Sequence, residues 1–268
     1  MTLPSPSRLA VYERQQFGRI RAETVRRLLA LWASIERIDD RTFEQWFASA
    51  LVLHQAAVDA VERTANGYLD AWGQANGLQV GEATGITVGR PASLEQTLRR
   101  PYVTTWTALA RGTAPQIARQ QGAQRARQIF ETDLQIARRE TLNRRIAQSG
   151  ERIVGYRRVL GPGENCGLCI VASTQRYHRD DLMPIHSSCG CGIEPLIGTR
   201  TPPRVLDRDL LKATRTALDG DPYTRSNLSR LRLDPEDLPT VEVRHHGELG
   251  PVLTDSRHQH TSPSDLAA

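Results

Sequence analysis

Apolar residues in the first third of the chain recur every three or four positions, which predicts two long helices. The first helix is expected over about 8–38, and Asp39-Asp40 ends it. The second is expected over about 43–72, and a short turn would let the two helices fold back on each other as an antiparallel hairpin. The first stripe comprises Phe17, Ile20, Thr24, Leu28, Leu31, Ile35 and Ile38, and the second comprises Phe43, Phe47, Ala50, His54, Ala57, Val61, Ala65, Tyr68 and Trp72.

The middle of the chain combines a glycine-rich loop with two further helices. The loop is expected over 77–91 and has room for a short strand. A helix is expected over 93–110, because Ser93 is a good cap and Pro101 is expected to start or kink the helix. A long helix is expected over about 115–149, with proline as its first residue.

This long helix is the basic part of the chain. Residues 111–145 hold eight arginines against Glu131, Asp133 and Glu140, a net charge of +5 that equals the formal charge of the whole protein. The segment predicts either a solvated face or a surface that meets DNA or an acidic protein. Its arginines are Arg111, Arg119, Arg125, Arg127, Arg138, Arg139, Arg144 and Arg145.

The hydrophobic period changes after residue 152 and marks a second region. A strand-like run over 153–159 leads into the cysteine region, and a second short strand is expected over 193–197. One more helix is expected over 205–218. Beyond Gly220 the sequence is rich in proline, serine, aspartate and histidine, which indicates disorder or ordering by a partner.

All four cysteines lie in this second region, at a spacing typical of a metal site. Cys166 and Cys169 form a Cys-x2-Cys pair, and His186 and Cys189 form a His-x2-Cys pair with Cys191 close behind. Four such ligands would close a tetrahedral structural zinc site. The first choice of ligands is Cys166, Cys169, His186 and Cys189, with Cys191 able to replace His186 or Cys189; disulfides and free thiols stay as alternatives.

The sequence lacks several enzyme motifs. His-Glu-x2-His, Gly-x-Ser-x-Gly, a phosphate-binding glycine loop and the deaminase His-x-Glu motif are missing. A zinc nuclease remains open, because His178, Asp180, Asp181 and His186 sit within the cysteine region. No apolar run is long enough to span a bilayer and no secretory signal is recognisable, so a location in the cytoplasm is expected. His54 is expected to be a core histidine, and the four tryptophans are expected to be core or interface anchors.

Four segments within about residues 115–200 together resemble the Mu F-like minor head proteins of tailed bacteriophages, and the preference for arginine over lysine and the long N-terminal hairpin look like the versions found in phages of actinobacteria. The four segments are Ile136-Ala137-Arg138-Arg139-Glu140-Thr141, Gly155-Tyr156-Arg157-Arg158-Val159, the Cys-x2-Cys pair, and Pro184-Ile185-His186-Ser187-Ser188-Cys189-Gly190-Cys191. In that family the helix typically reads Ala-Arg-Thr-Glu and the later turn reads Pro-x-His-Pro-Asn-Cys-Arg-Cys. Here Arg139 replaces the threonine, and Ser187, Ser188 and Gly190 replace the Pro, Asn and Arg.

The resemblance implies a head-morphogenesis protein with a few copies inside the shell. Its expected partners are the portal, the major capsid protein and packaged DNA, with no membrane, and its expected locations are the virion interior and the host cytoplasm during assembly. DNA or acidic partners would contact Arg119, Arg125, Arg127, Arg139, Arg144 and Arg145. Similar proteins are often labelled capsid maturation proteases, which is the alternative function beside the zinc nuclease.

The expected fold class is α+β. An elongated, mostly helical region over 1–112 would be followed by a small zinc-stabilised α/β module over 113–200, and by a short helix and loose tail over 201–268. Arg138 and Glu140 are expected to orient the basic helix against this module, through a salt bridge or hydrogen bonds. Zinc would substitute for a hydrophobic core that so small a module cannot build alone.

Overall fold

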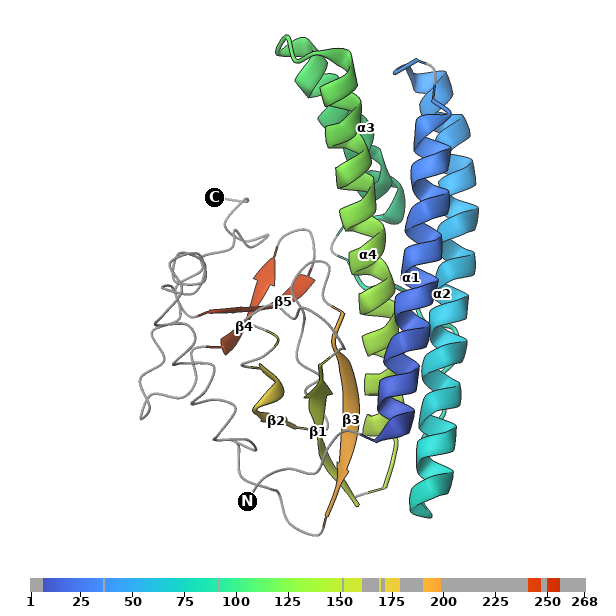
Figure 1. Cartoon of the computed structure of the whole chain (residues 1–268), viewed down its shortest axis with the longest axis vertical. Coiled ribbons are helices and arrows are strands. Elements are labelled where there is room, and N and C mark those ends of the chain that lie inside the picture. The colour runs from blue at the N-terminus through green and yellow to red at the C-terminus, as the bar shows by residue number, and fades with distance from the viewer. Residues whose placement is uncertain are drawn as a thin grey trace.

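The computed structural model describes residues 7–35, 37–90, 92–150, 152–160, 169, 172–178, 190–198, 241–246 and 250–255. In these residues, four long helices pack beside a small antiparallel sheet (Figure 1). The helices are α1 (Arg8–Ala33), α2 (Asp40–Asn76), α3 (Leu94–Ala110) and α4 (Pro115–Ala147). The strands are β1 (Ile153–Val159), β2 (Arg176–Tyr177), β3 (Gly192–Ile197), β4 (Val241–His246) and β5 (Gly250–Asp255). A mostly helical chain with a small sheet was predicted, and the structure confirms it in that coarse form.

The first two helices form the predicted hairpin, with different ends. α1 stops earlier than expected, although Ile35 beyond its end is still buried in the core. α2 starts earlier, because the Asp39 carboxylate accepts a hydrogen bond from the Thr42 backbone N–H at 2.9 Å and the Thr42 hydroxyl accepts one from the Asp39 N–H. α2 ends at Gly77, whose φ of 62° suits a residue without a Cβ.

The third and fourth helices also begin where the sequence predicts. Ser93 caps α3 by accepting a hydrogen bond from the Gln96 backbone N–H at 3.1 Å, and Pro115 is the first residue of α4. Pro101 lies inside α3 rather than at its start. Gly122 of α4 faces Thr105 of α3 and Trp32 of α1 so closely that an added Cβ would overlap both side chains. This glycine therefore sets the approach of three helices.

α4 is the central element of the fold. α1, α2 and α3 all pack against it, and in Figure 1 α3 covers the upper half of α4 while the sheet lies at the lower half. One hydrophobic cluster joins the lower half to the sheet, and it includes Tyr68 and Trp72 of α2, Ile146 of α4 and Tyr156 of β1. The sheet therefore shares a hydrophobic cluster with α1, α2 and α4.

The connection between α2 and α3 is extended chain held by side chains. The Glu62 carboxylate accepts hydrogen bonds from the backbone N–H groups of Gly85 and Ile86, both at 3.0 Å, and the Asn66 amide donates one to the Ala83 carbonyl at 2.9 Å. Residues 77–90, all of them described, contain no strand, so the short strand considered for this loop is absent. Polar side chains of α2 therefore hydrogen-bond to the loop backbone, as a neighbouring strand would.

The sheet has the order β2-β1-β3 with antiparallel pairing. β1 and β3 occur where the sequence predicts them. Their register places Arg157 opposite Glu194 and Tyr156 opposite Pro195. Opposite charges directly across two strands are a stabilising pair.

Part of the segment after Gly220, for which disorder or ordering by a partner is expected, forms two strands. β4 and β5 pair as an antiparallel hairpin, with Val243 opposite Leu253. Val241 and Val243 alternate with polar residues, a short strand pattern that the many polar residues nearby obscured. The helix predicted over 205–218 lies outside the described residues.

Candidate functional site

Arg138 occupies the centre of the contact between the helices and the sheet. The residue is 1% exposed, although a guanidinium is rarely buried without partners. Nε donates to Glu13 Oε1 of α1 at 2.7 Å, Nη2 donates to the other oxygen of the same carboxylate, and the guanidinium lies 4.4 Å from the ring centroid of Phe17. The bidentate geometry makes this a strong, directional pair.

The third donor group of Arg138 reaches the cysteine region. Nη1 donates to the backbone carbonyl of Cys191 at 2.9 Å, and the side chain of Gln135 donates to the same carbonyl at 3.4 Å. Arg138 and Cys191, which are 53 residues apart in two of the four segments described in the sequence analysis, are thus in direct contact. Glu140, which was expected to act with Arg138, is half-buried on α4. Glu13 is the carboxylate that pairs with Arg138, and its place in the first apolar helix gave no sign of this role.

Two of the five candidate zinc ligands are described, and they lie together. Cys169 and Cys191 are both buried and pack in one cluster with Leu160, so the Cys-x2-Cys half of the motif meets the later half. Cys166, His186 and Cys189 lie outside the described residues. Among the described residues, no group of three or more histidine, cysteine, aspartate or glutamate side chains could hold a metal ion.

A buried arginine contacts the sulfur of Cys191. Nη1 of the buried Arg158 donates to the Cys191 sulfur at 3.1 Å, and its guanidinium lies 5.2 Å from the ring centroid of Tyr177. A cationic donor beside a sulfur stabilises the deprotonated form, which is the form that binds zinc. Cys191, considered only as a replacement ligand, thus accepts a hydrogen bond from a buried arginine at its sulfur.

A second ion pair fixes the sheet to the start of α1. Arg157 of β1 donates to the Glu194 carboxylate of β3 at 2.6 and 2.9 Å, and the Ser7 backbone N–H donates to the same carboxylate at 3.0 Å. Tyr68 of α2 adds a hydrogen bond from its hydroxyl to the Ile193 carbonyl at 3.1 Å. Burial raises the pKa of Tyr68 well above the ordinary value of tyrosine. Adjacent arginines in a strand were the only sequence sign of this pair.

Several arginines of the basic helix form hydrogen bonds with other parts of the protein. Arg145 is buried and donates to the Asn66 carbonyl at 2.6 Å and to the Asp70 carboxylate at 2.5 Å. It is therefore not a surface residue, and the expectation that it contacts DNA or an acidic partner is wrong. Arg119 donates to the Ile35 carbonyl and is half-buried.

The remaining arginines expected to contact DNA or an acidic partner differ in exposure. Arg127 and Arg144 are exposed, and Arg127 pairs with Glu131 at 3.1 Å. Arg125 and Arg139 are half-buried. The exposed positive charge of α4 is therefore smaller than its arginine count indicates.

His54 is a buried core histidine, as predicted. Its Nε2 lies 3.0 Å from Asp133 Oδ2 of α4, and Asp133 also pairs with the buried Arg90. The His54 ring packs edge-on against Phe130, with centroids 5.4 Å apart. Asp133 therefore connects Arg90, in the loop before α3, to His54 in the middle of the bundle.

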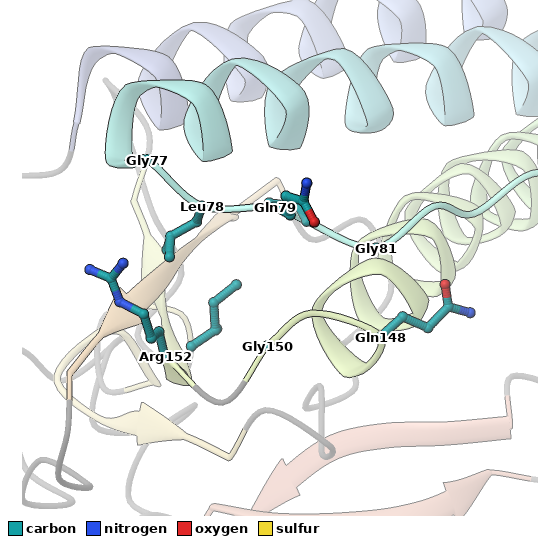
Figure 2. Close-up of a pocket in the computed structure, with 9 residues that line it drawn as sticks. Gly77, Leu78, Gln79, Gly81, Gln148, Gly150 and Arg152 are labelled. Atoms are coloured by element: carbon teal, nitrogen blue, oxygen red, sulfur yellow. The ribbon is translucent and has the colours of Figure 1, made fainter.

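The hollow shown in Figure 2 has a volume of about 460 Å³ and lies between the loop after α2, the end of α4 and the start of β1. Glycine backbone forms much of its wall, at Gly77, Gly81 and Gly150, and Arg152 is the one charged side chain among its nine lining residues. A hollow of this kind supplies no acid–base pair. Its residues can position backbone but do not form a catalytic group.

Comparisons of the chain with protein-family models, with curated proteins and with solved structures found no match. In the part of the chain that the structure describes, no helix is both long and apolar enough to cross a membrane.

Proposed function

We propose that this protein is a minor capsid component of a tailed bacteriophage that acts in head morphogenesis. In this proposal a few copies lie inside the shell near the portal, the major capsid protein and the packaged DNA, after assembly in the host cytoplasm. The observation that carries the proposal is the contact of Arg138 with the Cys191 carbonyl, because both residues belong to the segments that resemble the Mu F-like family. A structural module needs contacts that hold together segments far apart in the sequence, and this hydrogen bond is one of them.

We also propose a structural zinc ion in this module. Cys169 and Cys191 would each supply a thiolate, and two of Cys166, His186 and Cys189 would complete four ligands. Zinc would cross-link segments that a small sheet alone cannot hold. Arg158 would balance negative charge on the Cys191 sulfur, and Arg138 would connect this cross-link to the helices.

The buried charges support a structural role rather than a catalytic one. Arg138 with Glu13, Arg157 with Glu194, and Asp133 with Arg90 each join different elements of the fold. Their hydrogen bonds end on carboxylates and backbone carbonyls within the protein. Such groups hold elements in a fixed arrangement.

Co-expression with the portal and major capsid protein of the same phage tests the proposal. We expect the chain to co-purify with portal-containing assemblies and to leave the major capsid protein at full length. Cys191→Ser should reduce this association, whereas Arg63→Ser, at an exposed position of α2, should leave it unchanged. Trimmed capsid protein would support the maturation protease instead, and metal-dependent DNA cleavage would support the nuclease.

A further inference from the structure

A cavity of about 510 Å³ lies between the middle of α2 and the stretch 85–94 that leads into α3. It shares no lining residue with the hollow of Figure 2. Gln55, Thr87 and Ser93 line it and are exposed, so a molecule can enter it from solvent. Sites for small molecules typically have volumes of about 300–1,000 Å³, and this cavity falls within that range.

The wall of this cavity is largely aliphatic and is held in place. The Glu62 carboxylate accepts hydrogen bonds from the backbone N–H groups of Gly85 and Ile86, which fixes the loop against α2. A wall that is fixed before a ligand arrives lowers the entropic cost of binding. The aliphatic side chains of the wall are Val58, Ile86, Val88, Ala92 and Leu94.

His54 brings a buried nitrogen to this wall. The residue is 3% exposed, and among the described residues none forms a hydrogen bond with its Nδ1. Nε2 faces Asp133 of α4, and the two nitrogens of an imidazole ring point in largely opposite directions. None of the described residues that line the cavity belongs to α4. Nδ1 is therefore aimed away from α4, on the side where the cavity lies.

The Nδ1 atom of His54 is a hydrogen-bond acceptor that has no donor among the described residues. Asp133 Oδ2 lies 3.0 Å from Nε2, and a carboxylate accepts hydrogen bonds, so Nε2 carries the proton that this contact needs. In the neutral ring, the other nitrogen then has a lone pair and no hydrogen. A buried acceptor without a donor costs stability, and a bound molecule that carries a donor would satisfy it.

The charges around His54 favour a neutral ligand. Asp133 pairs with the guanidinium of Arg90, which also donates to the Ile129 carbonyl at 3.3 Å. One positive and one negative charge are thus already matched beside the cavity, and neither requires a charged ligand. A metal ion is a poorer occupant, because the described residues include no group of three histidine, cysteine, aspartate or glutamate side chains that could hold one.

We infer that this cavity binds a neutral, mainly apolar small molecule that carries one hydroxyl group, such as a phenol. The aliphatic wall contacts the apolar body of the ligand, and its hydroxyl donates a hydrogen bond to His54 Nδ1. This inference goes beyond the proposed function and stands on different residues. It holds whether or not the cysteine region binds zinc.

The test uses the full chain, isotope-labelled at nitrogen, and two aromatic probes of similar shape. β-Naphthol carries one hydroxyl donor, whereas its methyl ether has no hydrogen to donate. NMR titration measures the affinity of each probe and follows the Nδ1 signal of His54, which is identified by its absence from the spectrum of His54→Leu. We expect β-naphthol to bind at least tenfold more tightly than the ether and to shift the Nδ1 signal as it binds.

Three variants make the test specific to the cavity. His54→Leu should abolish the preference for β-naphthol, and Arg90 remains to pair with Asp133 in that variant. Ala92→Phe fills part of the cavity, leaves His54 in place and should weaken the binding of both probes at least tenfold. Val52→Ser, on an aliphatic residue of α2 that is 71% exposed and does not line the cavity, should change neither affinity.

Four results would overturn the inference. The first is that neither probe binds, and the second is that the wild-type protein binds both with equal affinity. The third is that His54→Leu keeps the preference for β-naphthol. The fourth is that Ala92→Phe binds both probes as tightly as the wild type, which would place the binding elsewhere. The second and fourth results decide the matter even if His54→Leu does not fold.

Discussion

Replacing Arg138 with methionine is expected to destabilise the protein strongly. The substitution removes both hydrogen bonds to Glu13, the hydrogen bond to the Cys191 carbonyl and the stacking on Phe17. Glu13 is 2% exposed, so its carboxylate would remain buried without a cation. Removing one partner of a buried ion pair typically costs about 3–5 kcal/mol. We therefore expect a loss of about 3–5 kcal/mol in the free energy of unfolding, measured by denaturant titration and far-UV circular dichroism.

A second variant separates the charge effect from the loss of packing. In Glu13→Leu/Arg138→Met no charge remains to be buried, and apolar replacement of a buried pair is often close to neutral. The double variant should therefore be more stable than Arg138→Met alone by about 2 kcal/mol. Arg144→Met, at an exposed position of the same helix, should change the free energy of unfolding by less than about 0.5 kcal/mol. A loss below about 1 kcal/mol for Arg138→Met, or a double variant no more stable than the single one, would refute the central position of this pair.

Three further predictions concern other parts of the fold. Gly122→Ala should lower the free energy of unfolding by about 1–3 kcal/mol, because the helices cannot then approach as closely. Gly67→Ala, with open space around it, should raise the free energy of unfolding by about 0.5–1 kcal/mol. A Gly122→Ala protein as stable as the wild type would contradict the close approach of the helices. The raised pKa of Tyr68 means that the folded state retains its proton where the unfolded chain loses it, so this contribution to stability is present below about pH 10 and is lost as the pH rises above it. Tyr68→Phe should flatten the alkaline loss of stability in denaturant titrations, and Tyr12→Phe, at an exposed position, should not. Zinc should co-purify at one ion per chain by elemental analysis, and Cys191→Ser should lower this ratio; a metal-free wild-type protein with unchanged stability in chelator would contradict the zinc proposal.

The helices could be predicted because their periodic apolar residues face the hydrophobic clusters between them. The starts of α3 and α4 were equally clear, since Ser93 as the cap of α3 and Pro115 as the first residue of α4 act through local backbone geometry that needs no distant partner. Two strands of the three-stranded sheet, β1 and β3, were predicted from short apolar runs, whereas the two-residue β2 was not. Each of these signals lies within a few residues of the structure that it specifies.

The charged network could not be predicted, because its partners are far apart in sequence. Glu13 and Arg138 are 125 residues apart, and Glu13 has the same local context as an exposed residue of a helix. For the same reason Arg145 seemed a surface arginine, although it binds Asp70 and the loop after α2. A count of charges along one helix does not reveal which of them face another element.

The zinc site stays a prediction. The spacing of the cysteines indicates a metal site, and the structure brings Cys169 and Cys191 into one buried cluster. The contribution of Arg158 to that site had no sequence signal, because it depends on the pairing of β1 with its neighbours. The sequence places Cys191 just after the His-x2-Cys pair and therefore makes it a substitute ligand. Its contacts in the folded protein have no sequence signal.

Quantitative mass spectrometry of purified phage particles tests the proposed function most directly. It counts the intact copies of this chain in each particle and reads the N-terminus of the major capsid protein. The proposal predicts a few intact copies per particle beside an untrimmed major capsid protein. Absence of the chain from mature particles whose capsid protein is trimmed would contradict it and support a maturation protease.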